Sequence, residues 1–328
     1  VAIVQKADDE GGCDSPVVTL ADDNDHVLEA LKNGTAQIAA GTSWLWAREE
    51  MKDSVDVLFV DEAGQVSLAN VLAISQAAKS LILLGDPQQL DQPQKGIHPP
   101  GADASALSHL LNGRPTIEEG RGLFLKDTWR LHPDVCAFTS EQFYDGRLVS
   151  RSENRNQRLN TKGLLDGTGL RFVPVEHSGN RSESEEEVMR VVELVTGLLA
   201  DGATWTDKEG ITKDLTLDHV LIVAPYNAQV AALLKALPRG SHVGTVDKFQ
   251  GQEAPVVFYS MATSSAEDAP RGMEFLYSLN RLNVATSRAK CLAVIVASPS
   301  LFMVQCGTPR QIELANSFCR FLEMAKMI

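Results

Sequence analysis

The most informative segment of the sequence is Val57-Leu58-Phe59-Val60-Asp61-Glu62-Ala63-Gly64-Gln65. Its four apolar residues predict a buried strand, and two acids follow that strand directly. A second apolar strand, Leu81-Ile82-Leu83-Leu84, leads into Gly85-Asp86-Pro87-Gln88-Gln89 in the same way. Because ligands of open α/β sheets bind at the carboxyl ends of the strands, we expect both polar segments to belong to one site.

The acids have a clear chemical use at such a position. An aspartate at a strand end, here Asp61, can hold Mg²⁺, and an adjacent glutamate, here Glu62, can orient and deprotonate an attacking water. Gly85 allows a tight turn, and a glutamine such as Gln89 can hydrogen-bond a γ-phosphate. Taken alone, the two acids are equally well explained as caps of the next helix.

Short apolar strands alternate with helical patterns along the chain, which predicts an α/β fold with parallel sheets. Further strands are expected at 220–223, 256–259 and 292–296. Helices are expected at 68–80, 228–237, 279–289 and 309–325, and after the acidic segment 182–187 as far as Ala200. A Gly/Pro-rich stretch, 92–120, separates two βα clusters. We therefore predict domains at 1–117 and 118–328.

The composition is that of a globular chain: 44% of its 328 residues are hydrophobic and 22% are charged. No apolar run approaches the roughly 18 residues of a membrane span, and the N-terminus has no signal-peptide pattern, so no membrane partner and a cytoplasmic location are expected. The five cysteines lack metal-ligand spacing.

The net charge of −13 does not favour phosphate binding, although a local groove can still be basic. One such excess lies at Arg147, Arg151, Arg155, Arg158 and Lys162. A solvated loop and a nucleic-acid-contacting surface both explain it.

Further motifs occur in a fixed order along the chain. They are Ala40 to Leu45 (A-G-T-S-W-L), Thr128 to Asp134 (T-W-R-L-H-P-D), Ala224 to Gln229 (A-P-Y-N-A-Q), Val243 to Glu253 (V-G-T-V-D-K-F-Q-G-Q-E) and Asn280 to Lys290 (N-R-L-N-V-A-T-S-R-A-K). With D-E-A-G-Q and G-D-P-Q-Q-L, this set resembles the motifs of superfamily 1 helicases. The wording is most similar to the 5′-to-3′ branch that includes the nonsense-mediated-decay helicases, and within it to prokaryotic helicases with an upstream RecB-like nuclease domain.

The resemblance implies two RecA-like domains of the P-loop NTPase class, with ATP and Mg²⁺ as cofactors. It implies catalytic roles for Asp61 (the metal ligand), Glu62, Gln65, Gln89, Arg130 and Arg288. It implies nucleotide contacts at Asp86, Trp129, Gln250, Gly251 and Glu253. Trp129 would stack on adenine, and a place in the core is its alternative.

The resemblance also implies single-stranded nucleic acid as the partner, with DNA favoured over RNA. The residues that match strand contacts are Thr42, Ser43, Tyr226, Asn227 and Thr245. Hydroxyl and amide groups of this kind bind phosphates without reading sequence.

One family motif is missing. The phosphate-binding loop G-x-x-x-x-G-K-[ST] does not occur, and the chain contains no Gly-Lys pair. We therefore expect a first domain truncated at its N-terminus, with the loop upstream of residue 1 and a nuclease-like domain beyond it, and negligible ATPase activity of this chain alone. The alternatives are a pseudo-motor that binds nucleic acid without hydrolysis, or a motor part that serves a nuclease domain.

Overall fold

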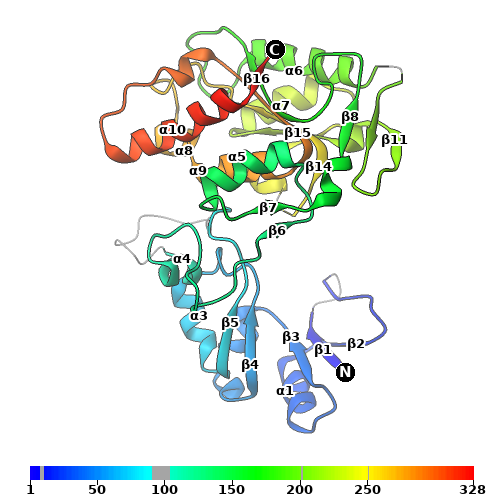
Figure 1. Cartoon of the computed structure of the whole chain (residues 1–328). Helices are drawn as coiled ribbons and strands as arrows, with labels where there is room; N and C mark the ends of the chain where they lie inside the picture. The colour runs from blue at the N-terminus through cyan, green and yellow to red at the C-terminus, as the bar shows by residue number, and fades with distance from the viewer. Residues whose placement is uncertain (8–10, 91–103, 201, 250) are drawn as a thin grey trace. The chain divides into compact units, whose positions relative to one another are not determined.

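The computed structural model describes residues 1–7, 11–90, 104–200, 202–249 and 251–328. The chain divides into two units, Val1–Arg114 and Pro115–Ile328, and each is described by itself (Figure 1).

A six-stranded sheet, parallel throughout, forms the centre of the second unit. Its strands, in spatial order, are β13 (His242–Thr245), β12 (Val220–Ala224), β14 (Ala254–Ser260), β15 (Ala289–Ala297), β9 (Gly169–Pro174) and β16 (Lys326–Met327). The central strands β12, β14 and β15 are almost wholly buried, as expected for a parallel sheet covered on both faces.

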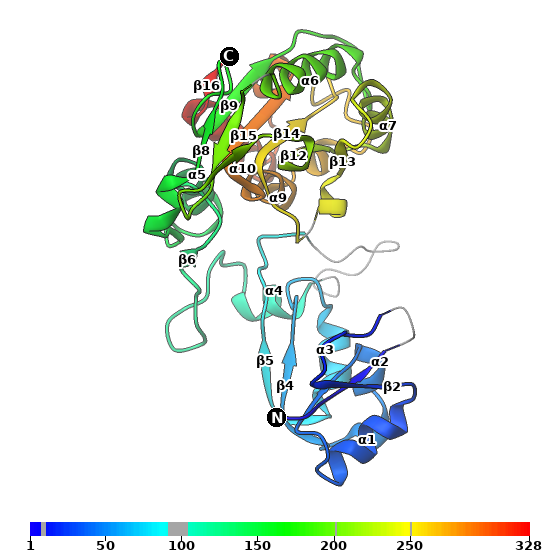
Figure 2. The ribbon, with the colours of Figure 1, turned by 90° about the vertical axis from the view of Figure 1, so that its right-hand side faces the viewer.

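Helices cover both faces of this sheet (Figures 1 and 2). One face packs against α6 (Glu185–Leu198) and α7 (Asn227–Ala236), and the other against α5 (Pro133–Phe143), α9 (Leu279–Ser287) and α10 (Pro309–Met324). Alternate strand residues point to opposite faces, so Ile222 and Phe258 join the α6 side of the core. On the other side the rings of Phe138 and Phe321 meet edge to face, 5.3 Å apart.

Smaller elements complete the second unit. They are the parallel pair β6 (Asp127–Thr128) and β7 (Val149–Ser150), the antiparallel sheet of β8 (Arg158–Asn160), β10 (Thr204–Thr206) and β11 (Thr212–Asp214), the helix α8 (Met273–Leu276), and the 3₁₀ turns η2 (Ser152–Asn156), η3 (Leu217–His219), η4 (Val246–Phe249) and η5 (Pro299–Phe302).

Two parallel sheets form the first unit. One has the order β2 (Val18–Ala21), β1 (Ile3–Lys6), β3 (Ile38–Ala40), and the other pairs β4 (Val55–Val60) with β5 (Ala78–Leu83). Its helices are α1 (Asn24–Lys32), α2 (Ser43–Trp46), α3 (Leu68–Ser75) and α4 (Ala106–Leu111), with the 3₁₀ turn η1 (Glu49–Met51). The predicted α/β class with parallel sheets is confirmed.

One sequence expectation about a helix is wrong in detail. The helix expected at 68–80 ends at Ser75, because β5 starts at Ala78 and pairs with β4, Val55 opposite Ala78. Backbone pairing with a neighbouring strand overrides the helical preference of this segment. Within the Gly/Pro-rich stretch 92–120, residues 92–103 lie outside the described part, and α4 follows with Ser105 as its N-cap.

Among the described residues, no helix combines the length and the apolar character that crossing a membrane requires.

Candidate functional site

The acids Asp61 and Glu62 stand at the carboxyl end of β4, and both are exposed. Glu62 has φ of 51°, a left-handed backbone conformation that costs a non-glycine residue about 1–2 kcal/mol. The Asp61 carboxylate accepts the Glu62 N–H at 2.9 Å, and the Glu62 carbonyl accepts the Gln65 N–H at 2.7 Å. The turn that follows β4 therefore has a strained backbone at Glu62.

The loop after β5 locks this turn in place. The Ala63 N–H donates to the Leu84 carbonyl at 2.7 Å, and a Cβ at Gly64 would lie 2.6 Å from the Asp86 carbonyl oxygen. A Cβ at Gly85, whose φ is 153°, would lie 2.8 Å from the Ala63 nitrogen. Only glycines allow the two loops to approach so closely. The two acidic loops that the sequence assigned to one site are therefore in direct contact.

Amide side chains border the acids. The Gln89 side chain donates to the Asp86 carboxylate at 2.9 Å, and the same carboxylate accepts the Gln88 N–H at 2.9 Å. The Nε2 of Gln65 is buried and has no hydrogen-bond partner within the described residues. A buried amide without a partner costs about 1–3 kcal/mol, so Gln65 has a donor available for a bound group.

In the second unit, Glu253 joins two basic residues. Arg130 Nε donates to its carboxylate, and Lys290 Nζ lies 2.8 Å from its other oxygen. Burial raises the pKa of Glu253, but the hydrogen bonds from Lys290 and Arg130 outweigh it and hold the pKa at about 2. The sequence pointed to Glu253 and Arg130 but gave no signal that they pair, nor that Lys290 belongs with them.

The second expected arginine lies next to this cluster in the fold. Arg130 Nη1 donates to the carbonyl of Ser287 at 3.3 Å, and Arg288 follows as the C-cap of α9. Arg288 is only 3% exposed, whereas the Arg130 side chain is 30% exposed. Gly251 has φ of 78°, and Gln250 lies outside the described residues.

Trp129 is 60% exposed, so the alternative that placed it in the core is wrong. The Arg151 guanidinium lies 3.6 Å from the centre of its ring, and Lys208 Nζ lies 5.7 Å away. A cation held against an exposed indole fixes the ring plane.

The expected strand contacts differ in exposure. Thr42 is exposed at the start of α2, with Ser43 half-buried beside it, and Trp44 follows with 84% exposure. In the second unit, Ala224 pairs with Thr245 across β12 and β13, so Tyr226, Asn227 and Thr245 reach the same sheet edge. Asn227 is exposed and Thr245 is half-buried.

Tyr226 does not fit a direct strand contact. It is 7% exposed, and its ring lies 5.5 Å from the ring of Phe275. Burial raises the pKa of its phenol. The sequence motif gave no indication that another aromatic residue covers this one.

The basic segment 147–162 is not a plain solvated loop, because it forms β7, η2 and β8. Arg147 donates to the Ile117 carbonyl at 2.8 Å and to Thr116 Oγ1 at 2.9 Å. Arg151 pairs with Glu153 and Arg158 with Asp166. Arg147 therefore links this segment to residues 116–117, whereas Arg151 and Arg158 form surface ion pairs.

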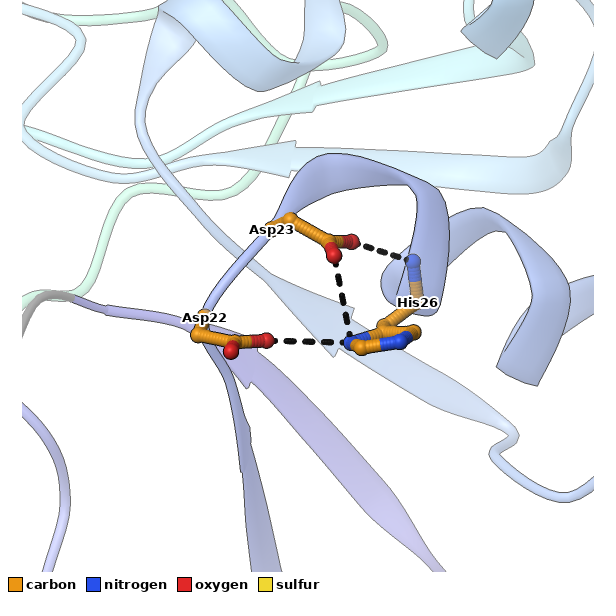
Figure 3. Close-up of side chains that lie close together, drawn as sticks. All are labelled: Asp22, Asp23 and His26. Carbon is orange, nitrogen blue, oxygen red and sulfur yellow. Dashed lines mark hydrogen bonds and ion pairs between the residues drawn. The ribbon is translucent and has the colours of Figure 1, made fainter.

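One group of potential metal ligands occurs in the described part of the chain, Asp22, Asp23 and His26 (Figure 3). Asp23 caps α1 by accepting the His26 N–H at 2.8 Å, and Asp22 accepts from the His26 ring at 3.0 Å. The hydrogen bond to Asp22 raises the pKa of His26. This exposed arrangement is explained as a helix cap.

Two protein-family profiles match the chain. A family profile described as "AAA domain" matches residues 103–300, and a second profile with the same description matches residues 28–92. Since the first match covers more than half of the chain, the chain belongs to the AAA-domain family.

Several helicases are similar in sequence. "Helicase sen1" of Schizosaccharomyces pombe is 26% identical over 259 residues, which is 74% of this chain and 14% of that protein. "Regulator of nonsense transcripts 1 homolog" of Drosophila melanogaster is 27% identical over a region that covers 76% of this chain and 21% of that protein. "DNA polymerase alpha-associated DNA helicase A" of Schizosaccharomyces pombe is 27% identical over a region that covers 72% of this chain and 36% of that protein. The chain thus spans about a third or less of the length of these relatives.

Among solved structures, an arterivirus nonstructural protein 10 (helicase) with DNA aligns with a TM-score of 0.43 at 15% identity. The alignment covers 91% of this chain and 48% of that one.

Proposed function

We propose that this chain carries the motor residues of an ATP-dependent helicase or translocase that acts on single-stranded nucleic acid. The observation that carries the proposal is the strained, glycine-locked turn that presents Asp61 and Glu62. Strain at a non-glycine residue persists where the surrounding structure enforces it, typically at functional sites. The similarity to helicases supports the same conclusion.

The residues of the first unit fit a magnesium-bound nucleoside triphosphate. Mg²⁺ prefers carboxylate oxygen ligands beside substrate phosphates, and the exposed Asp61 carboxylate offers such oxygens at a strand end. A bound Mg²⁺ would neutralise charge on the phosphate oxygens. Glu62 would accept the proton of the attacking water, Gln65 would orient that water, and Gln89, beside Asp86, would hydrogen-bond the terminal phosphate.

The residues of the second unit fit the charge that develops during phosphoryl transfer. A planar guanidinium donates two parallel hydrogen bonds to phosphate oxygens, and we assign this role to Arg130. The sequence resemblance implies the same role for Arg288, but that residue is only 3% exposed and does not fit a direct phosphate contact. In this assignment Glu253 holds Arg130 in place, and Gly251 lines the same site. Trp129, fixed on one side by Arg151, would stack on the base.

Hydrolysis of ATP would then drive movement along a single strand. Thr42, Ser43, Asn227 and Thr245 would contact the strand backbone. Movement from 5′ to 3′, a preference for DNA and an associated nuclease domain remain parts of the proposal that rest on the sequence resemblance.

A second candidate is a nucleic-acid-binding pseudo-motor that does not hydrolyse ATP. The 328 residues contain no Gly-Lys pair, so they do not themselves supply the lysine of a phosphate-binding loop. The strained Glu62 argues against it, since a protein without hydrolysis has no chemical need for that turn.

The first experiment tests strand binding itself. Fluorescence anisotropy with labelled oligothymidylate and oligouridylate should show binding that weakens as salt rises, because phosphate contacts release counterions. Equal anisotropy with and without the protein, for both oligonucleotides at low salt, would refute the proposed function.

A further inference from the structure

A ring between two arginines lies at the surface of the second unit. The guanidinium of Arg271 lies 3.8 Å from the centre of the Phe275 ring, and that of Arg281 lies 4.4 Å from it. Beneath them, the Tyr226 ring lies 5.5 Å from Phe275. We call Arg271, Phe275 and Arg281 the arginine–phenylalanine cluster.

The cluster lies at the carboxyl edge of the six-stranded sheet. Tyr226 follows β12, and Asp247, which follows β13, lies 3.3 Å from Arg281 Nη1. Arg271 and Phe275 belong to the connection between β14 and α9. Thr245 and Asn227, the expected strand contacts of this unit, emerge at the same edge. Side chains from several connections therefore meet where a ligand of a parallel sheet binds.

Accessibility distinguishes the cluster from Tyr226. The tyrosine is 7% exposed, so it cannot offer a face to a nucleotide. Arg271 is exposed and, within the described part of the chain, forms no ion pair. Arg281 is 17% exposed and is partly balanced by Asp247, and the exposed Glu274 adjoins Phe275 in sequence. Within the cluster, the available positive charge is thus chiefly that of Arg271.

Stacking on the Phe275 ring leaves the guanidinium N–H groups of Arg271 and Arg281 in a position to bind phosphate. A guanidinium is weakly hydrated on its faces, so an aromatic ring can cover a face while the N–H donors in its plane remain available. Holding the side chain against a ring also reduces the rotamer freedom that is lost on binding. Two such groups on one ring form a fixed pair of donors.

We propose that the arginine–phenylalanine cluster binds the phosphodiester backbone of the single strand, with Arg271 as the main contact. Tyr226 supports Phe275 from below and does not touch the strand. This inference rests on the proposed function, since it adds to the strand contacts of the second unit a group whose main members, Arg271 and Phe275, lie outside the recognised motifs.

The test compares Arg271→Ala, Phe275→Leu and a control, Arg239→Ala, in the whole chain. Arg239 is exposed and precedes β13, so it lies at the opposite, amino edge of the sheet. Anisotropy titrations with oligothymidylate and oligouridylate of equal length are repeated over a salt series. For Arg271→Ala we expect about tenfold weaker binding and a log–log salt slope that is less steep by about one, because one phosphate contact is lost. Phe275→Leu should weaken binding by a smaller factor, and Arg239→Ala should match the unaltered chain.

The outcomes separate this inference from the proposed function. If the unaltered chain binds but Arg271→Ala binds with the same affinity and salt slope, only the inference fails. If the loss appears with one oligonucleotide and not the other, the contact is not to the shared backbone, and the inference also fails. If the unaltered chain binds neither oligonucleotide, both proposals fail. Unchanged circular dichroism and urea midpoints for Phe275→Leu establish that its effect is on binding.

Discussion

Arg130 donates its Nε–H to the carboxylate of Glu253, 123 positions further along the chain. Lys290 Nζ forms an ion pair with the other oxygen of the Glu253 carboxylate. The arrangement keeps an arginine, which we assign to the phosphates, in one orientation before any ligand binds.

Removing the charge of Glu253 should make stability less dependent on pH in acid. The folded pKa of about 2 lies below the ordinary value of 4.5, so the carboxylate stabilises the fold above pH 4.5 and loses this effect as the pH falls toward 2. Because the side chain is 38% exposed, we expect Glu253→Gln to cost only about 1 kcal/mol near neutral pH. Urea denaturation across the pH range measures the free energy of unfolding of Glu253→Gln and of the unaltered chain. Glu274→Gln is the control. A difference between Glu253→Gln and the unaltered chain that does not shrink below pH 4.5 would contradict the assignment.

Glycine at position 62 should stabilise the protein. Glu62 adopts φ of 51°, which glycine accepts without strain, so Glu62→Gly should raise the free energy of unfolding by about 1 kcal/mol. Glu62→Ala removes the same carboxylate but keeps the Cβ, and should give no such gain. Chemical denaturation of both variants measures the difference, and equal stabilities would show that the backbone there is unstrained.

Adding a methyl group at Gly64 should disturb the acidic turn. Its Cβ would meet the Asp86 carbonyl at 2.6 Å, so the loop after β5 must shift, at a cost of about 1–3 kcal/mol. Thermal unfolding provides the measurement. Gly197→Ala, where nothing lies within 4 Å of the added Cβ, serves as the matched substitution and should cause no loss.

The chain by itself should not turn over ATP at a significant rate. It contains no Gly-Lys pair to bind and neutralise the phosphates. Phosphate release in the presence of single-stranded oligonucleotide should equal that of Glu62→Gln. Robust, strand-stimulated hydrolysis that Glu62→Gln abolishes would show that other residues replace the missing loop.

The sequence predicted what local pattern determines. Apolar runs identified the central strands β4, β12, β14 and β15, and the acids after β4 were expected beside the loop after β5, as the structure has them. Strand boundaries were less accurate, because β15 extends from Ala289 and pairing with neighbours, not composition, sets its ends.

Contacts between distant segments could not be predicted in this way. Glu253 with Lys290, Trp129 with Arg151, and Phe275 over Tyr226 each depend on how loops from different strands meet. Tyr226 shows the consequence: its motif predicted a strand contact, but the packing of Phe275 buries it. No spacing rule in a single sequence contains that information.

We propose that Asp61 and Arg130 each contribute to the binding of a nucleoside triphosphate. The most direct measurement is the affinity for a fluorescent, non-hydrolysable ATP analogue with Mg²⁺, in the unaltered chain and in Asp61→Asn, Arg130→Ala and the control Arg239→Ala. Charge-assisted contacts of this kind contribute about 1.5–3 kcal/mol, so we predict that Asp61→Asn and Arg130→Ala each weaken binding at least about tenfold while the control does not. An affinity that depends on only one of the two residues, or on neither, would contradict the account.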